Sequence, residues 1–278
     1  MDSSNQKSTT WHADTIERLT NLLQADEDVV ALVLYGSALE PDRLDSWSDV
    51  DAFIVVRDDA MARFFPSTDW LTPLGTLFAK EQFAGEPTRT TRVCFEDLRK
   101  LDLVFTTLSE AQRIDTWSHV PFVEGASTCF SRDQGITQKL TRSFPRPAYA
   151  PMTREAFEAL ADAFWFRTMV AVSKVAREDL VIAFHLALGL LQDGCLLAML
   201  LRDRAERTTV HKTGGIANEI VATFTETAQP PTVDGILNLI EASGRIFDRL
   251  AGEWSTAYRP RMAFISAAVA RARSERAP

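Results

Sequence analysis

The stretch Leu34-Tyr35-Gly36-Ser37, followed across a polar loop by Ser48-Asp49-Val50-Asp51, decides the fold of this 278-residue chain. It is preceded by residues 29–34, a short and almost wholly apolar run rich in β-branched side chains. Residues 52–56 form a second run of the same kind. Such runs are typical of strands buried on both faces of a sheet. We therefore predict two strands, with Gly36-Ser37 at the end of the first and two aspartates at the start of the second.

The polar residues at these strand ends suit a phosphate and a metal ion. Glycine at position 36 lets the backbone turn and come close to a ligand, and Ser37 offers a hydroxyl and an N–H to a phosphate oxygen. Asp49 and Asp51 are two residues apart on an extended segment, so their side chains point to the same side. Two adjacent carboxylates form the oxygen-rich site that Mg²⁺ prefers. A Gly-Ser pair before a loop is common, and two aspartates at the start of a strand can simply be a solvated strand end. The order of strand, Gly-Ser, loop and Asp-x-Asp nevertheless favours a metal-and-phosphate centre.

A third carboxylate lies in a later segment. Residues 91–95 and 101–105 have the composition of strands, and Asp102 stands alone among the apolar residues of the second. A lone carboxylate in a buried strand costs free energy unless a metal, a cation or a hydrogen bond compensates it. Asp102 is therefore either a third acidic group of the same centre or an edge-strand aspartate that faces water.

The composition is that of an ordinary globular protein, with 46% hydrophobic and 24% charged residues. The first residues show no basic segment followed by an apolar one, so we expect no signal peptide. Cys94, Cys129 and Cys195 are odd in number and lack metal-ligand spacing. These cysteines predict a reduced, cytoplasmic protein.

The net charge of −8 comes from the first half of the chain. Residues 1–151 carry 15 Lys and Arg against 23 Asp and Glu, whereas residues 152–278 carry 15 of each. An acidic domain repels nucleic-acid backbones and attracts cations. This argues against a nucleic-acid partner and favours a metal and a polycationic substrate, although the acidity could also serve solubility alone.

The chain divides at residues 144–151, where three prolines in seven residues resist both helix and strand. We predict a domain of α/β (α+β) class with a small mixed sheet over residues 1–148, and an all-helical bundle over residues 149–278. In the first domain we also expect helices at 11–24, at 57–65 and from Ser109, and a helix or loop at 67–90 that covers one edge of the sheet.

Beyond the boundary the apolar spacing is helical throughout. Met152-Thr153-Arg154-Glu155 is typical of a helix start. Residues 180–201 have the length of a membrane span, but polar residues including His185 interrupt them. We therefore predict a central helix buried in the bundle, with His185 in its core. Gly214-Gly215 and Pro230-Pro231 mark breaks, and further helices are expected at 236–254 and 260–273.

Gly36-Ser37 with Asp49-Val50-Asp51 resembles the Gly-Ser…Asp-x-Asp signature of the polymerase-β-like nucleotidyltransferase superfamily. Two antibiotic-modifying branches, the lincosamide nucleotidyltransferases and the streptomycin-type aminoglycoside adenylyltransferases, are similar over most of residues 26–200. The segments that carry this likeness are Tyr35-Gly36-Ser37, residues 67–71, residues 95–98 and the stretch from Phe164-Trp165 through Lys174 to Leu180.

The resemblance implies a role for each residue of the centre. Gly36 and Ser37 would hold phosphate oxygens of ATP, and Asp49 and Asp51 would bind Mg²⁺. The family carries its third acidic residue in a comparable strand, so Asp102 would be the third metal ligand and the general base.

Lys174 is, by its helical setting alone, a lysine whose stem packs while its ammonium group reaches water. The resemblance implies instead that it clamps the triphosphate. Kanamycin-type relatives carry a catalytic glutamate four residues before this lysine, where this chain has Val170. A base from the helical domain is therefore not expected, which favours Asp102.

Together these features imply a Mg²⁺-dependent enzyme that transfers AMP from ATP to a hydroxyl of a small antibiotic and so confers resistance. The segment likeness leans to a lincosamide, while the acidic first domain leans to an aminoglycoside. Two alternatives stay open, a nucleotidyltransferase that acts on a protein hydroxyl and a non-catalytic nucleotide-binding regulatory protein. We expect no nucleic-acid partner and no membrane, and leave a homodimer open. Acidic candidates for an acceptor pocket between the domains are Glu86, Glu158 and Asp162.

Overall fold

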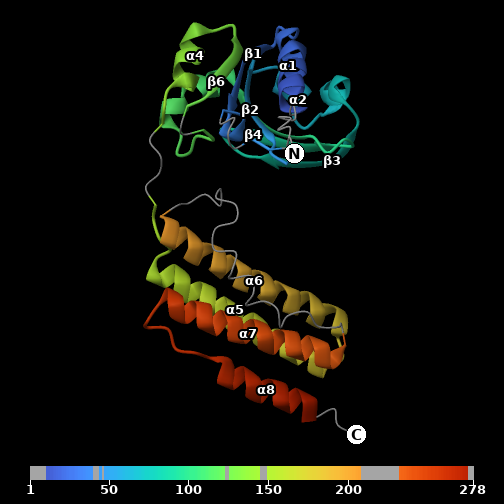
Figure 1. Ribbon diagram of the computed structural model, residues 1–278, viewed down its shortest axis with the longest axis vertical. Coiled ribbons are helices and arrows are strands. Elements are labelled where there is room, and N and C mark those ends of the chain that lie inside the picture. The colour runs from blue at the N-terminus through green and yellow to red at the C-terminus, as the bar shows by residue number, and fades with distance from the viewer. Residues whose placement is uncertain are drawn as a thin grey trace, which may run out of the picture. The chain divides into compact units, whose positions relative to one another are not determined.

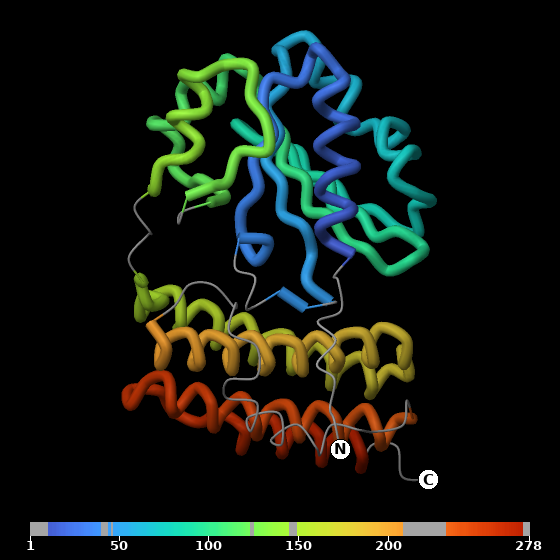
Figure 2. Tube along the Cα trace, turned by 45° about the horizontal axis from the view of Figure 1, so that its top comes forward, coloured from blue at the N-terminus to red at the C-terminus, as the bar shows by residue number. Residues whose placement is uncertain are grey.

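The computed structural model describes residues 11–39, 44–45, 47–122, 125–144, 149–207 and 232–274. Contacts divide the chain into two compact units, Met1–Pro147 and Ala148–Pro278. The first contains a sheet with helices on it, and the second shows only helices in its described residues (Figures 1 and 2). This confirms the α/β (α+β) class with a helical bundle. The proline-rich segment 144–151 lies partly outside the described residues.

One six-stranded mixed sheet forms the framework of the first unit. Its strands are β1 (Val29–Tyr35), β2 (Val50–Val56), β3 (Leu77–Ala84), β4 (Arg89–Phe95), β5 (Lys100–Thr107) and β6 (Ser127–Ser131). They lie in the order β3-β4-β5-β2-β1-β6. β2 and β5 pair in parallel, and the other neighbours pair antiparallel. β1 and β2 lie inside the sheet, where all but the last residue of β1 is buried, as their apolar runs predict.

Helices cover the two faces of this sheet unequally. They are α1 (Trp11–Gln24), α2 (Met61–Phe64), α3 (Leu108–Gln112) and α4 (Gln134–Thr141), with the 3-10 turns η1 (Gly36–Leu39), η2 (Asp69–Leu74) and η3 (Ile114–Thr116). α1, α2 and η2 share one core with the sheet, and Figure 2 shows the dark blue helix α1 lying along that face. α3, η3 and α4 share a second core with β1, β2 and β5.

The second face of the sheet is left open over β3 and β4. Among the described residues, none from these two strands belongs to the core under α3 and α4. The side chains of Glu81 on β3 and Arg92 on β4 are accordingly 62% and 55% exposed. This open face of β3 and β4 is therefore accessible to solvent right next to the buried strand β5.

Two strands were not expected from the sequence. Segment 67–90, for which we predicted a helix or loop, contains η2 and the edge strand β3. Six of the eight residues of β3 are exposed, and its alanine, lysine, glutamate and glutamine are poor strand formers. Pairing with β4, not local composition, makes it a strand. β6 lies in a stretch with no clear pattern, and it completes the other edge by pairing with β1.

The helix expected to begin at Ser109 is α3, but its N-cap is Thr107. The Thr107 side chain accepts a hydrogen bond from the N–H of Glu110. A cap of this kind satisfies one of the free N–H groups of the first helical turn. The capping residue is thus two positions earlier than the sequence pattern indicated.

The second unit consists of long helices packed on a common core. They are α5 (Arg154–Ala176), α6 (Leu180–Glu206), α7 (Val233–Trp254) and α8 (Met262–Ser274). Thr153 caps α5 by accepting a hydrogen bond from the N–H of Ala156, as its sequence predicted. The rings of Phe164 and Phe247 stack in the core with centroids 3.8 Å apart. His211-Lys212, Gly214-Gly215 and Pro230-Pro231 lie outside the described residues.

α6 is less buried than predicted. It is long and apolar enough for a membrane span, with a mean hydropathy of 1.8, but only 28% of that window is buried inside the protein. A narrow stripe of mostly small residues packs against α5 and α7, while large residues such as Val181 and Leu188 are exposed. His185 is also exposed, so the expected core histidine is wrong. Length and apolarity could not show which face of the helix is covered.

Asp248 of α7 ties the start of α8 to the bundle. Its carboxylate accepts hydrogen bonds from the N–H of Arg261 at 3.0 and 3.1 Å and from the N–H of Met262 at 2.8 Å. The Tyr258 hydroxyl donates to it at 2.6 Å and accepts from Trp165 Nε1 at 2.8 Å. Because the first N–H groups of a helix have no partner within it, this buried carboxylate stabilises the beginning of α8.

Candidate functional site

Strand register brings five side chains of the first unit into one row across the sheet. Glu81 pairs with Arg92, and Arg92 pairs with Asp102. Asp102 pairs with Asp51, and Asp51 pairs with Tyr35. Directly paired residues project from the same face of a sheet. The row therefore places two of the predicted site residues, Asp51 and Asp102, side by side, with an arginine next to them.

Gly36 lies directly against the Asp51 carboxylate. Its φ is +68°, in the left-handed region that favours glycine. A Cβ atom at this position would lie 2.1 Å from Asp51 Oδ2, far inside van der Waals contact. Glycine is therefore required both for the turn and to leave room for the carboxylate. Ser37 follows in the turn η1 and is partly buried.

The two oxygens of Asp102 have different surroundings. Oδ2 accepts a hydrogen bond from Arg92 Nε at 3.0 Å, whereas Oδ1 is buried without a hydrogen-bond partner. Burial raises the pKa of Asp102 above its usual value, the Arg92 guanidinium opposes this shift, and the charges of Asp49 and Glu81 add to it. Asp102 is thus not the water-facing aspartate of an edge strand, because it lies inside the sheet and is largely covered.

Tyr35 lies in the electrostatic field of the three predicted carboxylates. Burial raises the pKa of its phenol well above the usual range, and the charges of Asp51, Asp102 and Asp49 raise it further. Tyr35 therefore stays a neutral phenol at the end of β1, next to all three acidic groups.

The loop before Asp49 is held in place by side chains. Asp45 Oδ1 accepts hydrogen bonds from the N–H groups of Trp47 at 2.9 Å and Ser48 at 2.8 Å. The carbonyl oxygen of Ser48 lies 3.2 Å from Nε2 of the buried His12 on α1. These contacts fix the backbone immediately before Asp49 and so position its carboxylate.

A pocket of about 280 Å³ opens beside these carboxylates. It lies on β3, β4 and β5, and its lining includes Asp49, Glu81, Arg92, Lys100 and Asp102. Acidic and basic side chains thus surround a cavity that extends to the beginnings of β2 and β5. A polar cavity of this kind offers room for a reacting group next to the Asp102 carboxylate.

The carboxylates suit a Mg²⁺ ion in their chemistry. Asp102 Oδ1 is a buried oxygen without a partner, and hard oxygen ligands are those that Mg²⁺ takes. In the part of the chain that the structure describes, no three His, Cys, Asp or Glu side chains meet closely enough to hold a metal as they stand. Asp102 Oδ2 is engaged by Arg92 instead. Metal binding by Asp49, Asp51 and Asp102 stays a prediction.

Lys174 lies in the last turn of α5, in the second unit. Its Nζ forms an ion pair with Asp179 Oδ2 at 2.9 Å, and the two side chains are 33% and 38% exposed. Exposed ion pairs of this type contribute about 0–1 kcal/mol, so the ammonium group can exchange its partner for a phosphate. Its role as a phosphate clamp stays a prediction.

Arg92 and Glu81 are residues of the row that motif reasoning missed. Residues 91–95 and 101–105 were expected as strands, and the structure pairs them antiparallel with Arg92 opposite Asp102. The two expected strands did not by themselves determine that register. Glu81 gave no signal, because β3 was not expected to be a strand.

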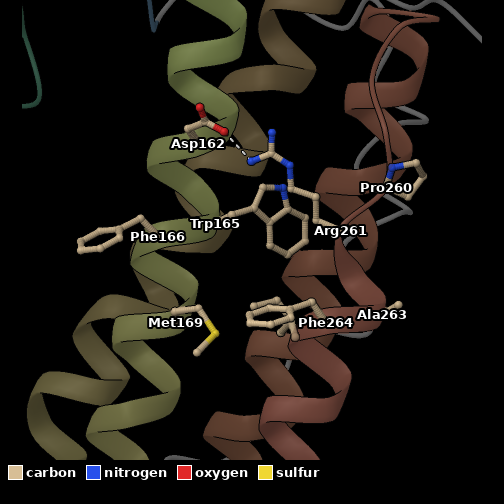
Figure 3. A pocket seen from close by; sticks show the side chains of 9 residues that line it. Asp162, Trp165, Phe166, Met169, Pro260, Arg261, Ala263 and Phe264 are labelled. Atoms are coloured by element: carbon tan, nitrogen blue, oxygen red, sulfur yellow. Dashed lines mark hydrogen bonds and ion pairs between the residues drawn. The ribbon is translucent and has the colours of Figure 1, made fainter.

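A larger pocket of about 750 Å³ lies within the helical unit, between α5 and the first turn of α8 with the two residues before it (Figure 3). Trp165, Met169 and Phe264 line it, and Asp162 forms an ion pair with Arg261 beside them. Asp162 was one of the acidic acceptor candidates. The lining is almost wholly apolar and contains none of the six predicted site residues. Asp162 and Arg261, the charged residues of its lining, are paired with each other.

Comparisons with known proteins give one family match. A family model described as streptomycin adenylyltransferase matches residues 11–228. No curated protein sequence matches the chain.

Several solved structures are similar over most of their length. An aminoglycoside 6-adenyltransferase from Bacillus subtilis is 13% identical, with 95% of this chain and 98% of that chain covered and a TM-score of 0.37. A nucleotidyltransferase-like protein from Exiguobacterium sibiricum is 11% identical, with 87% and 78% covered and a TM-score of 0.33. A STING-associated CdnE c-di-GMP synthase from Capnocytophaga granulosa is 11% identical, with 87% and 81% covered and a TM-score of 0.27. At these TM-scores none of the three likenesses bears on the chemistry of this chain.

Proposed function

Because the chain belongs to the streptomycin adenylyltransferase family, whose model spans residues 11–228, we propose that it transfers AMP from ATP to a hydroxyl of an aminoglycoside antibiotic. The family makes the chain a nucleotidyltransferase enzyme of the kind that modifies antibiotics. One observation carries the assignment of the site. Asp51 and Asp102 stand side by side in the cross-strand row, with Gly36 against the first and Asp49 close to the second.

The proposed reaction makes one P–O bond and breaks another. The oxygen of the acceptor hydroxyl bonds to the α-phosphorus of ATP, while the bond from that phosphorus to the oxygen bridging to the β-phosphate breaks. Pyrophosphate leaves with the electron pair of the broken bond. Asp102 takes the hydroxyl proton on its carboxylate, and burial raises the pKa of this group above the usual aspartate value.

Other residues bind and orient the nucleotide. Gly36 and Ser37 offer backbone N–H groups and a hydroxyl to the β- and γ-phosphates, and Lys174 neutralises part of the triphosphate charge. Asp49, Asp51 and Asp102 would hold Mg²⁺, which when bound neutralises phosphate charge and polarises the α-phosphoryl group. Tyr35, held neutral by its surroundings, adds no further negative charge next to the phosphates.

Three observations support an aminoglycoside over a lincosamide as the substrate of this proposed reaction. The matching family is described by streptomycin, and residues 1–151 carry 23 acidic against 15 basic side chains. An acidic surface attracts a polycationic substrate and speeds its encounter. The pocket beside Asp102 has the carboxylate of Glu81 in its lining, which can accept hydrogen bonds from an ammonium or guanidinium group.

Mass spectrometry of reaction mixtures tests this proposal. Purified protein is incubated with ATP, Mg²⁺ and either streptomycin or lincomycin, and each antibiotic is examined for the mass of one added adenylyl group. We expect the gain on streptomycin, its loss in Asp49→Asn, and its retention in Asp59→Asn, which changes an exposed aspartate of the same unit in the same way. A gain on lincomycin alone would move the substrate to the lincosamides. No gain on either antibiotic, despite measurable ATP binding, would overturn the proposal and favour a protein acceptor or a regulatory role.

A further inference from the structure

Arg92 is held on three sides although half of its side chain faces solvent. Its Nε donates to Asp102 Oδ2 at 3.0 Å, and its Nη1 lies 3.6 Å from Glu81 Oε2. Its guanidinium carbon also lies 5.4 Å from the centre of the Phe83 ring, within the range of a cation–π contact. Glu81 and Phe83 are two residues apart on β3, so both lie on the face that carries Arg92. These contacts together restrain the guanidinium.

This restrained position determines the orientation of the Asp102 carboxylate. A carboxylate that is free to rotate about its last bond exchanges its two oxygens. Here Oδ2 is committed to Arg92, while Oδ1 is buried and has no partner in the protein. A charge-assisted hydrogen bond is about twice as strong as a neutral one, so it fixes the orientation of the carboxylate. The hydrogen bond from Arg92 therefore anchors the carboxylate in one orientation.

We propose that Arg92 is a positioning residue that fixes the orientation of the Asp102 carboxylate beside the pocket, and that Glu81 and Phe83 in turn hold Arg92. This inference rests on the proposed adenylyl transfer and adds a residue that acts through the base. Arg92 does not touch the reacting atoms in this role. It reduces the number of orientations that Asp102 samples, so it acts on the rate of the chemical step.

Steady-state kinetics of arginine variants tests the role. Arg92→Met keeps much of the apolar stem and removes the hydrogen bond. We expect kcat to fall on the order of 10²-fold, with the KM values for ATP and streptomycin within about threefold of wild type, because small misplacements of a reacting group cost this much. Arg92→Lys keeps the charge but lacks the planar fork, so it should recover part of the loss.

Arg89→Met is the matched control. Arg89 lies three residues earlier on β4, so it projects from the opposite face, and its nearest acidic partner is Glu86 at 3.9 Å. We expect wild-type kcat for this variant. A rise in KM at unchanged kcat in Arg92→Met would overturn the inference, since it would make Arg92 a substrate-binding residue. An equal fall of kcat in Arg92→Met and Arg89→Met would also overturn it, because a general weakening of β4 would then explain both.

The background of Asp102→Asn gives the decisive comparison. If Arg92 acts through the Asp102 carboxylate, adding Arg92→Met to Asp102→Asn should leave the residual rate within about twofold, since effects of residues that act as a unit are not additive. A further fall in the double variant similar to that in wild type would refute the positioning role. Failure of the inference is distinguishable from failure of the proposed function. Wild-type protein that adenylylates no antibiotic defeats the function, whereas active wild type with an unaffected Arg92→Met defeats only the inference.

Discussion

Replacing Gly36 with alanine should disable the enzyme by moving Asp51. The added Cβ would lie 2.1 Å from Asp51 Oδ2, and an ordinary contact between such atoms begins at about 3.5 Å. The carboxylate must therefore retreat by about 1.4 Å, or the turn must open by a similar amount. Both movements displace a predicted Mg²⁺ ligand from the row that it shares with Asp102.

The cost has two parts that can be measured separately. A non-glycine residue with φ near +68° costs about 1–2 kcal/mol of folding free energy, which lowers the melting temperature by roughly 2–8 °C for a chain of this size. A displacement of about 1 Å at a reacting or ligating group costs on the order of 10²-fold in rate. We therefore expect a folded protein with a modest loss of stability and a large loss of kcat/KM.

The assay combines thermal unfolding, acceptor-dependent release of pyrophosphate, and binding of Mn²⁺ as a spectroscopic substitute for Mg²⁺. Gly85→Ala serves as the control, because Gly85 has an ordinary backbone conformation and its added Cβ would lie at a normal 3.5 Å from the carbonyl oxygen of Thr88. A folded Gly36→Ala variant with kcat/KM within threefold of wild type would refute the reasoning. Lost activity with wild-type Mn²⁺ binding would show that the contact does not position a metal ligand.

Four further outcomes follow from the same structure. Asp102 must be ionised to act as a base, and burial raises its pKa. We therefore expect kcat/KM to fall as the pH drops through a value above the ordinary aspartate pKa of about 3.9. A pH profile in which activity falls only at or below that value would contradict this. A raised pKa means that the ionised Asp102 carboxylate lowers the stability of the folded protein at pH values above that pKa. Asp102→Asn should therefore be inactive yet at least as stable as wild type at pH 7, and the difference in melting temperature should shrink toward pH 4. A clearly lower melting temperature of the variant at pH 7 would argue against this. Lys174→Met should raise the KM for ATP about tenfold, as expected for the loss of one charged contact worth ~1.4 kcal/mol. Substitution of the exposed neighbouring residue, Arg177→Met, should leave this KM unchanged. Equal KM values in the two variants would show that Lys174 does not belong to the nucleotide site. Asp248→Asn should lower the free energy of unfolding by about 1–3 kcal/mol with little change in kcat, because the amide cannot replace both acceptor oxygens. Unfolding in urea measures this free energy. An unchanged urea concentration at the midpoint of unfolding would contradict the capping role.

Structural features that depend on residues close together in the chain were predictable from the sequence. The strand at 29–35 and its partner at 50–56 are so apolar that only the interior of a sheet suits them, and the structure has both there. The pattern of Gly36-Ser37 and Asp49-Val50-Asp51 led to the family, which the match over residues 11–228 confirms. Helix α1, the cap of α5 at Thr153 and the long helices of the second unit also followed from periodicity and capping residues.

Features that depend on partners distant in the chain were decided only by the tertiary structure. β3 is a strand because β4 pairs with it, although its own residues favour other conformations. The exposed face of α6 depends on where α5 and α7 lie, which apolarity alone does not reveal.

The candidate site divides in the same way. The sequence supplied the three aspartates as residue types with the right chemistry for phosphoryl transfer. Only the parallel register of β2 and β5 sets Asp51 beside Asp102, and only the antiparallel register of β4 and β5 sets Arg92 against the Asp102 carboxylate. Local sequence determines which conformation a segment prefers, but the register between strands is set by burial and pairing across the whole sheet, and that register decides which charges meet.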